Sequence, residues 1–70
     1  MFDKKYKKTL EILNDEIEMY RKLYHNSLDL ADSTMNDISK KFHLDKAREY
    51  QRICIELSDL KTRILKEIES

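Results

Sequence analysis

The sequence predicts an all-α fold: an antiparallel helical hairpin that dimerises into a four-helix bundle. Apolar residues recur at spacings of three and four along most of the chain, which is the helical period. The sequence contains no Gly and no Pro, so tight β-hairpin turns are hard to build, whereas Asn, Asp and Ser turns between helices remain accessible. Its 70 residues form a single domain, 1–70, whose core alone would be marginal. A second copy is therefore expected to complete the core.

The first predicted helix covers about residues 3–31. Its main stripe is the set of apolar residues expected to face the second helix: Phe2, Tyr6, Leu10, Leu13, Ile17, Tyr20, Tyr24, Leu28 and Ala31. At 100° per residue these side chains share one face of an amphipathic helix of about eight turns. Met35, Ile38 and Phe42 continue the same stripe in phase.

A turn is predicted at about residues 32–35. This stretch collects short polar side chains, which compete with the helix for backbone hydrogen bonds. Thr34 followed by Asp37 is a shortened N-cap box, which would start the next helix. A second break is considered at residues 43–45, where Asp45 is a candidate N-cap.

The second predicted helix covers about residues 35–69, and a break at 43–45 would separate a short middle helix from it. Its apolar face contains Ala47, Tyr50, Ile53, Cys54, Leu57, Leu60, Ile64, Leu65 and Ile68. A turn at 32–35 gives two arms of nearly equal length, which can cover each other's stripes. One alternative, a hairpin turning at 43–45, leaves part of a long first helix bare. The other, an uninterrupted parallel coiled coil, places Asp45 and Lys46 in its apolar seam.

The first helix carries a second apolar stripe, at spacings of 7, 4 and 7: Ile12, Met19, Leu23 and Leu30. These residues lie within about 40° of each other and about 120° around the helix from the main stripe. One partner helix cannot bury both stripes, so the aligned set predicts a further contact surface. Burial by a second copy is the preferred interpretation. A different protein partner, docking of the chain's own terminus, and plain solvent exposure are the alternatives.

No residue pattern indicates a catalytic, cofactor or metal site, and the chain is therefore expected not to be an enzyme. No Ser or Cys lies in a context that supplies a base and an orienting acid, and no Gly-rich loop can hold phosphate. His25, Asp29 and Asp32 share one helix side but lack the second histidine or the thiolate typical of metal sites. The single cysteine, Cys54, is expected to be a small buried side chain.

DNA binding is the alternative function. Residues 36–53, NDISKKFHLDKAREYQRI, resemble a helix-turn-helix with its turn at His43 and Leu44. The second helix of this resemblance would present three basic residues to DNA: Lys46, Arg48 and Arg52. The segment departs from the pattern at His43, where Gly is usual, and at Glu49, where an aliphatic residue is usual. A formal net charge of zero also argues against general attraction to nucleic acid.

The expected function is that of a non-enzymatic protein–protein interaction module. The hairpin would self-associate as a homodimer and bind or inhibit another protein, in the manner of small bacterial or phage accessory factors. No apolar run is long enough for a signal sequence or a membrane span, so a cytoplasmic location without membrane binding is expected. No cofactor is expected.

Overall fold

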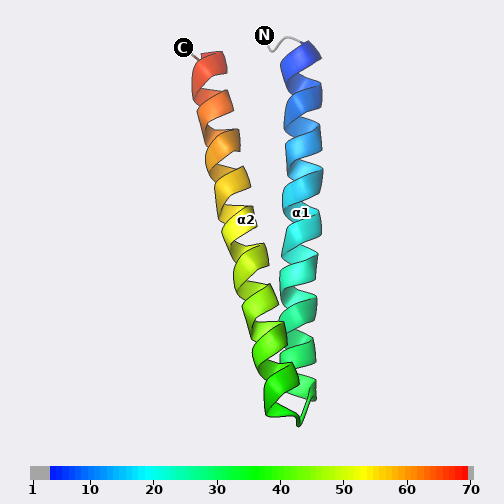
Figure 1. Cartoon of the computed structure of the whole chain (residues 1–70). Coiled ribbons are helices and arrows are strands. Elements are labelled where there is room, and N and C mark those ends of the chain that lie inside the picture. The colour runs from blue at the N-terminus through cyan, green and yellow to red at the C-terminus, as the bar shows by residue number, and fades with distance from the viewer. Residues whose placement is uncertain (1–3, 70) are drawn as a thin grey trace.

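The described chain consists of two long helices joined by a short loop (Figure 1). The structure, a computed structural model, describes residues 4–69, with α1 at Lys4–Ser33 and α2 at Asp37–Glu69. The helices lie side by side and run antiparallel, so the start of α1 and the end of α2 share one end of the hairpin (Figure 1). The predicted all-α helical hairpin is confirmed.

Asn36 starts α2. Its side-chain Oδ1 accepts hydrogen bonds from the backbone N–H groups of Ile38, at 2.8 Å, and Ser39, at 3.2 Å. This is the geometry of an N-cap, which satisfies two of the N–H groups that a helix start leaves without partners. The expected box of Thr34 and Asp37 does not form. The Thr34 hydroxyl instead accepts a hydrogen bond from the N–H of Asn36, at 3.3 Å, which helps to shape the loop.

The loop itself occupies residues 34–36, and α1 continues to Ser33, two residues beyond its expected end. α2 runs without interruption through residues 43–45, although Asp45 is a candidate N-cap by sequence. Neither Pro nor Gly occurs there, so no residue removes a backbone donor or favours unfolding of the turn. The short middle helix and the hairpin that turns at 43–45 are therefore not what the structure shows.

The core of the hairpin is thin. Among the described residues, the buried hydrophobic side chains are Leu13, Ile17, Ala31 and Ala47. Ser27 is also buried. Among the residues that the structure describes, no large side chain is fully buried. Two of the four core positions are alanines, which bring the helices close but contribute little apolar area. Burial between the two helices is therefore modest for a chain of this length.

Two contacts set the register of the helices. The rings of Tyr20 and Tyr50 pack with their centroids 6.1 Å apart, and the Cys54 thiol donates a hydrogen bond to the Ile17 carbonyl at 3.7 Å. The residue numbers in these pairs add to 70 and 71. In an antiparallel pair this sum is constant along the helices, so residues whose numbers add to about 71 lie at the same level.

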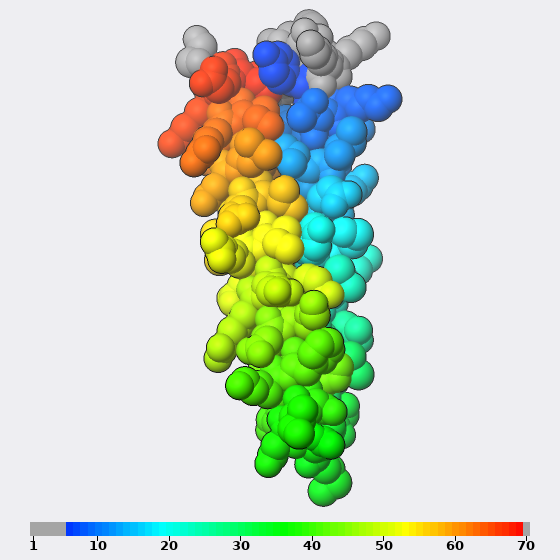
Figure 2. Space-filling view, in the orientation of Figure 1, coloured from blue at the N-terminus to red at the C-terminus, as the bar shows by residue number. Residues whose placement is uncertain are grey.

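The hairpin is long and narrow, as the space-filling view shows (Figure 2). Its extents are 53 × 15 × 11 Å and its radius of gyration is 16.0 Å, whereas a compact domain of this length has a radius of about 11 Å. Its accessible surface is 6020 Å², against about 4,700 Å² for a typical folded monomer of this mass. The shape therefore exposes about 1,300 Å² more than a compact fold would.

Several residues predicted for the inner face are exposed. Met35, Ile38 and Phe42 do not continue the main stripe, because the loop at 34–36 interrupts the helical phase and α2 restarts with another side toward α1. Leu60 is also exposed, although the sequence placed it on the inner face. Tyr6 of the main stripe is exposed as well, and Phe2 lies outside the described residues.

Candidate interaction surface

The α1 stripe, consisting of Ile12, Met19, Leu23 and Leu30, is not covered by α2. Ile12 is 55% exposed, Met19 is 43% exposed and Leu30 is 42% exposed. Leu23 is half-buried. The stripe extends along most of α1, so these side chains form a row and are not scattered points on the surface.

A second exposed row lies on α2 and was missed from the sequence: Phe42, Ile53 and Leu60. Phe42 and Leu60 are exposed and Ile53 is half-buried. On the helical wheel these three lie within about 20° of each other and about 90° from the direction of α2 that faces α1. We call this row the α2 stripe. The sequence pattern places all three residues on inner faces, because it does not fix the phase of α2 relative to α1.

The α1 stripe and the α2 stripe lie on the same side of the hairpin. Each stripe is offset around its helix from the side that faces the other helix, by about 120° on α1 and about 90° on α2. On both helices the offset is in the sense of decreasing residue number. Because the helices run antiparallel, rotations in the same sense lead to the same side of the pair. Together the two stripes form one surface, which we call the apolar face.

The two stripes also match in level. The register set by Cys54 and Ile17 brings three pairs opposite each other, each with residue numbers that add to 72. These rungs of the described apolar face are Ile12 with Leu60, Met19 with Ile53, and Leu30 with Phe42. At the level of Leu23 the α2 side carries an ion pair instead, with 3.4 Å between Lys46 Nζ and Glu49 Oε2.

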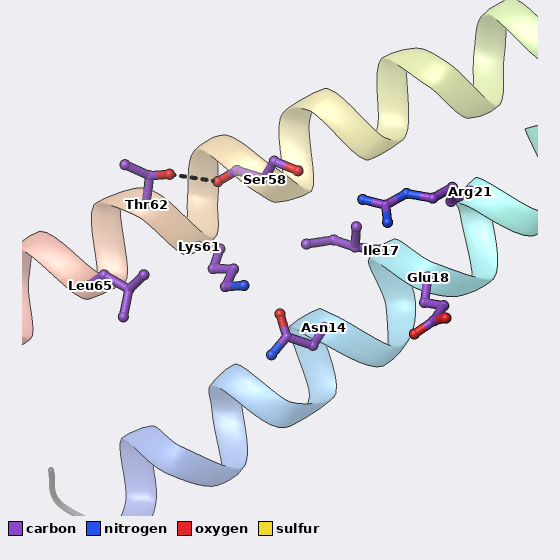
Figure 3. Close-up of a pocket in the computed structure, with 8 residues that line it drawn as sticks. All are labelled: Asn14, Ile17, Glu18, Arg21, Ser58, Lys61, Thr62 and Leu65. Carbon is purple, nitrogen blue, oxygen red and sulfur yellow. Dashed lines mark hydrogen bonds between the residues drawn. The ribbon is translucent and has the colours of Figure 1, made fainter.

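On the opposite side of the hairpin, the side chains between the two helices are mostly polar (Figure 3). A groove of about 650 Å³ runs there between the helices, lined by Asn14, Ile17, Glu18, Arg21, Ser58, Lys61, Thr62 and Leu65. Within this lining there is no His or Cys, so neither hydroxyl has an imidazole base beside it. Thr62 donates its hydroxyl hydrogen to the Ser58 carbonyl of its own helix, at 3.0 Å. The groove therefore offers mixed charge and hydrogen-bonding groups without a nucleophile–base arrangement.

The three residues predicted as DNA contacts do not converge. Lys46 pairs with Glu49 on the apolar face, and its Nζ lies 5.8 Å from the centre of the Phe42 ring. Arg48 and Arg52 lie at least about 120° away around the helix. The turn at His43 and Leu44 that the helix-turn-helix resemblance implies does not form, because α2 is one continuous helix there.

The remaining candidates for chemistry also give no site. Among the described residues, no group of three or more His, Cys, Asp or Glu side chains is placed to hold a metal ion. His25 packs edge-on against the Tyr24 ring, with 5.3 Å between the centroids. Within residues 4–69, neither helix has an apolar stretch sufficient to cross a membrane.

Comparisons with protein families, with curated proteins and with solved structures found no match to this chain.

Proposed function

We propose that this chain is a non-enzymatic protein–protein interaction module that self-associates and binds or inhibits another protein. The apolar face carries the proposal. Its α1 stripe stays largely exposed in the folded hairpin, and the α2 stripe extends it across both helices. Single exposed apolar residues are normal on a protein surface, but an aligned patch that spans two elements marks a contact site.

The thin core supports the self-association. The exposed area of 6020 Å² is about half of what the unfolded chain would expose, so folding buries about 50%, against about 60% for typical small domains. A contact that covers the apolar face would add the missing apolar burial. The proposal therefore includes a dimer in which two hairpins form a four-helix bundle, in the cytoplasm and without a cofactor.

The decisive variant is Met19→Lys with Leu23→Lys. It places two charges on the apolar face, where burial of an unpaired charge is costly. We expect the wild type to sediment as a dimer at micromolar concentration, with an apparent stability that rises with concentration. The double variant should be monomeric, less stable and still helical, and it should lose any protein that the wild type captures from extracts of its native host.

Two controls separate this effect from general damage. Leu44→Lys with Ile55→Lys makes the same exchange at exposed residues on the other side of α2, and should change neither sedimentation nor capture. Ile17→Lys with Tyr20→Lys should unfold the chain, because both residues belong to the contact between α1 and α2. A wild type that sediments as a monomer, with Met19→Lys and Leu23→Lys silent in stability and capture, would reduce the apolar face to scattered surface residues.

A further inference from the structure

We infer that the apolar face is covered by a second copy of the hairpin turned end for end, through a two-fold axis that crosses α1 at the level of Arg21. The inference rests on the proposed function, because it names the occupant and the orientation of the same surface. Such a dimer is isologous: each contact between two different residues occurs twice.

The spacing of the α1 stripe is the first observation. Its intervals of 7, 4 and 7 residues read the same in both directions, so the stripe is symmetric about position 21. When two α1 helices pack antiparallel about that position, Ile12 lies opposite the partner's Leu30 and Met19 lies opposite the partner's Leu23. All four residues of the stripe then meet an apolar residue.

The same axis also suits α2. The rungs of the apolar face have residue numbers that add to 72, so position 21 lies at the level of residue 51 on α2. Antiparallel packing of the two α2 helices about this level brings Phe42 opposite the partner's Leu60. It also brings Ile53 opposite the partner's Glu49, so this level pairs an apolar side chain with a charged one. Both helices therefore pair apolar residues under one two-fold axis, α2 at the level of Phe42 and Leu60.

The area also agrees with a second copy as the occupant. A standard stable interface removes about 800 Å² from each partner. The hairpin exposes about 1,300 Å² more than a compact monomer of its mass. A contact along the apolar face can therefore supply the area of a stable dimer from surface that the hairpin has in excess.

A spin-label distance tests the orientation in the full chain. Met35 is 100% exposed in the loop, so Met35→Cys in a Cys54→Ser background can carry a nitroxide without disturbing the core. Each label lies 14 residues from the axis, so the antiparallel dimer predicts about 42 Å between labels along the bundle, at 1.5 Å per residue. A distance below about 20 Å, the width of a bundle, would overturn the end-for-end orientation.

Disulfide trapping gives a second readout that does not depend on the label. In the Cys54→Ser background, Ile12→Cys and Leu30→Cys are prepared as separate single-cysteine chains. Mild oxidation should crosslink an equimolar mixture of the two, while either chain alone should stay uncrosslinked because its copies lie far apart along the bundle. Equal crosslinking in the separate samples, or none in the mixture, would contradict the axis at position 21.

The outcomes separate this inference from the proposed function. A chain that sediments as a monomer, yet captures a host protein through Met19 and Leu23, overturns the two-fold pairing and leaves the interaction module standing. If the chain is monomeric, and Met19→Lys with Leu23→Lys changes neither its stability nor its capture of a host protein, both the two-fold dimer and the interaction module are overturned. The expected label distance together with crosslinking in the mixture supports the antiparallel dimer specifically.

Discussion

The Cys54 thiol donates a hydrogen bond to the backbone carbonyl of Ile17 on the opposite helix, with 3.7 Å between sulfur and oxygen. Cys54 lies on the inner side of α2 and is half-buried, next along the chain to the exposed Ile55. This contact joins residues 37 positions apart, and it marks the register at which the rungs of the apolar face lie opposite each other.

Cys54→Ala should lower the free energy of unfolding by about 1 kcal/mol, through the lost sulfur contacts and hydrogen bond. Its neighbour provides the matched control, since Ile55 is 56% exposed and Ile55→Ala should stay within about 0.5 kcal/mol of the wild type. Urea unfolding at one fixed protein concentration measures both, because association would otherwise shift the result. Equal losses in the two variants would mean that Cys54 is not a register contact.

Asn36→Ala should destabilise the hairpin by about 1 kcal/mol, because the backbone N–H groups of Ile38 and Ser39 lose their acceptor. Asn36→Asp should retain most of the stability, since a carboxylate caps equally well and suits the start of a helix. Thermal unfolding of these variants is compared with that of Thr34→Ala. A larger loss for Thr34→Ala than for Asn36→Ala would restore the N-cap box expected from the sequence.

The fold class and the α1 stripe could be predicted from the sequence because both depend on phase within one unbroken helix. Within α1, residue number alone places Ile12, Met19, Leu23 and Leu30 in a row, and the loop changes nothing about their relation. The absence of Pro and Gly favours long unbroken helices. The short polar side chains at residues 32–37 place the turn to within two residues of its observed position.

The α2 stripe could not be predicted in the same way. Phe42 and Ile38 are in phase with the main stripe if the helix is continuous, but the loop at 34–36 lets α2 restart at Asn36 with another side toward α1. Leu60 lies beside Ile12 only because of the register of the two helices, which shows in the contact between the distant residues Cys54 and Ile17. No local pattern carries that information, so the apolar face emerges only when both helices are placed.

We expect no sequence-specific DNA binding at physiological salt. Arg52 Nε lies 3.3 Å from Glu56 Oε1, and Lys46 Nζ lies 3.4 Å from Glu49 Oε2. Two of the three basic residues are therefore paired with a carboxylate on their own helix. Footprinting over a random duplex library measures this directly, with Arg48→Ala and Arg52→Ala as the variants. A footprint that both substitutions abolish would support the DNA-binding alternative. Weak binding seen only at low salt would not support it, because any lysine cluster can contact phosphates.

The ion pair of Lys46 and Glu49 is expected to weaken the dimer relative to an apolar layer at the same level. Lys46→Leu with Glu49→Leu would give Leu23 an apolar neighbour on α2 and complete the apolar face. Exchanging a partly desolvated ion pair for hydrophobic residues is often stabilising by 1 kcal/mol or more, so the dimer Kd should fall about tenfold.

Sedimentation equilibrium over a dilution series measures the Kd, and the chain provides a matched control. Arg52→Leu with Glu56→Leu removes an ion pair with side chains 82% and 64% exposed on the outer side of α2, and should leave the Kd unchanged. Lys46→Leu alone should raise the Kd, because Glu49 then stays charged and unpaired on the buried surface. If both double variants tighten association equally, added hydrophobicity is the cause, and the ion pair lies outside the dimer contact.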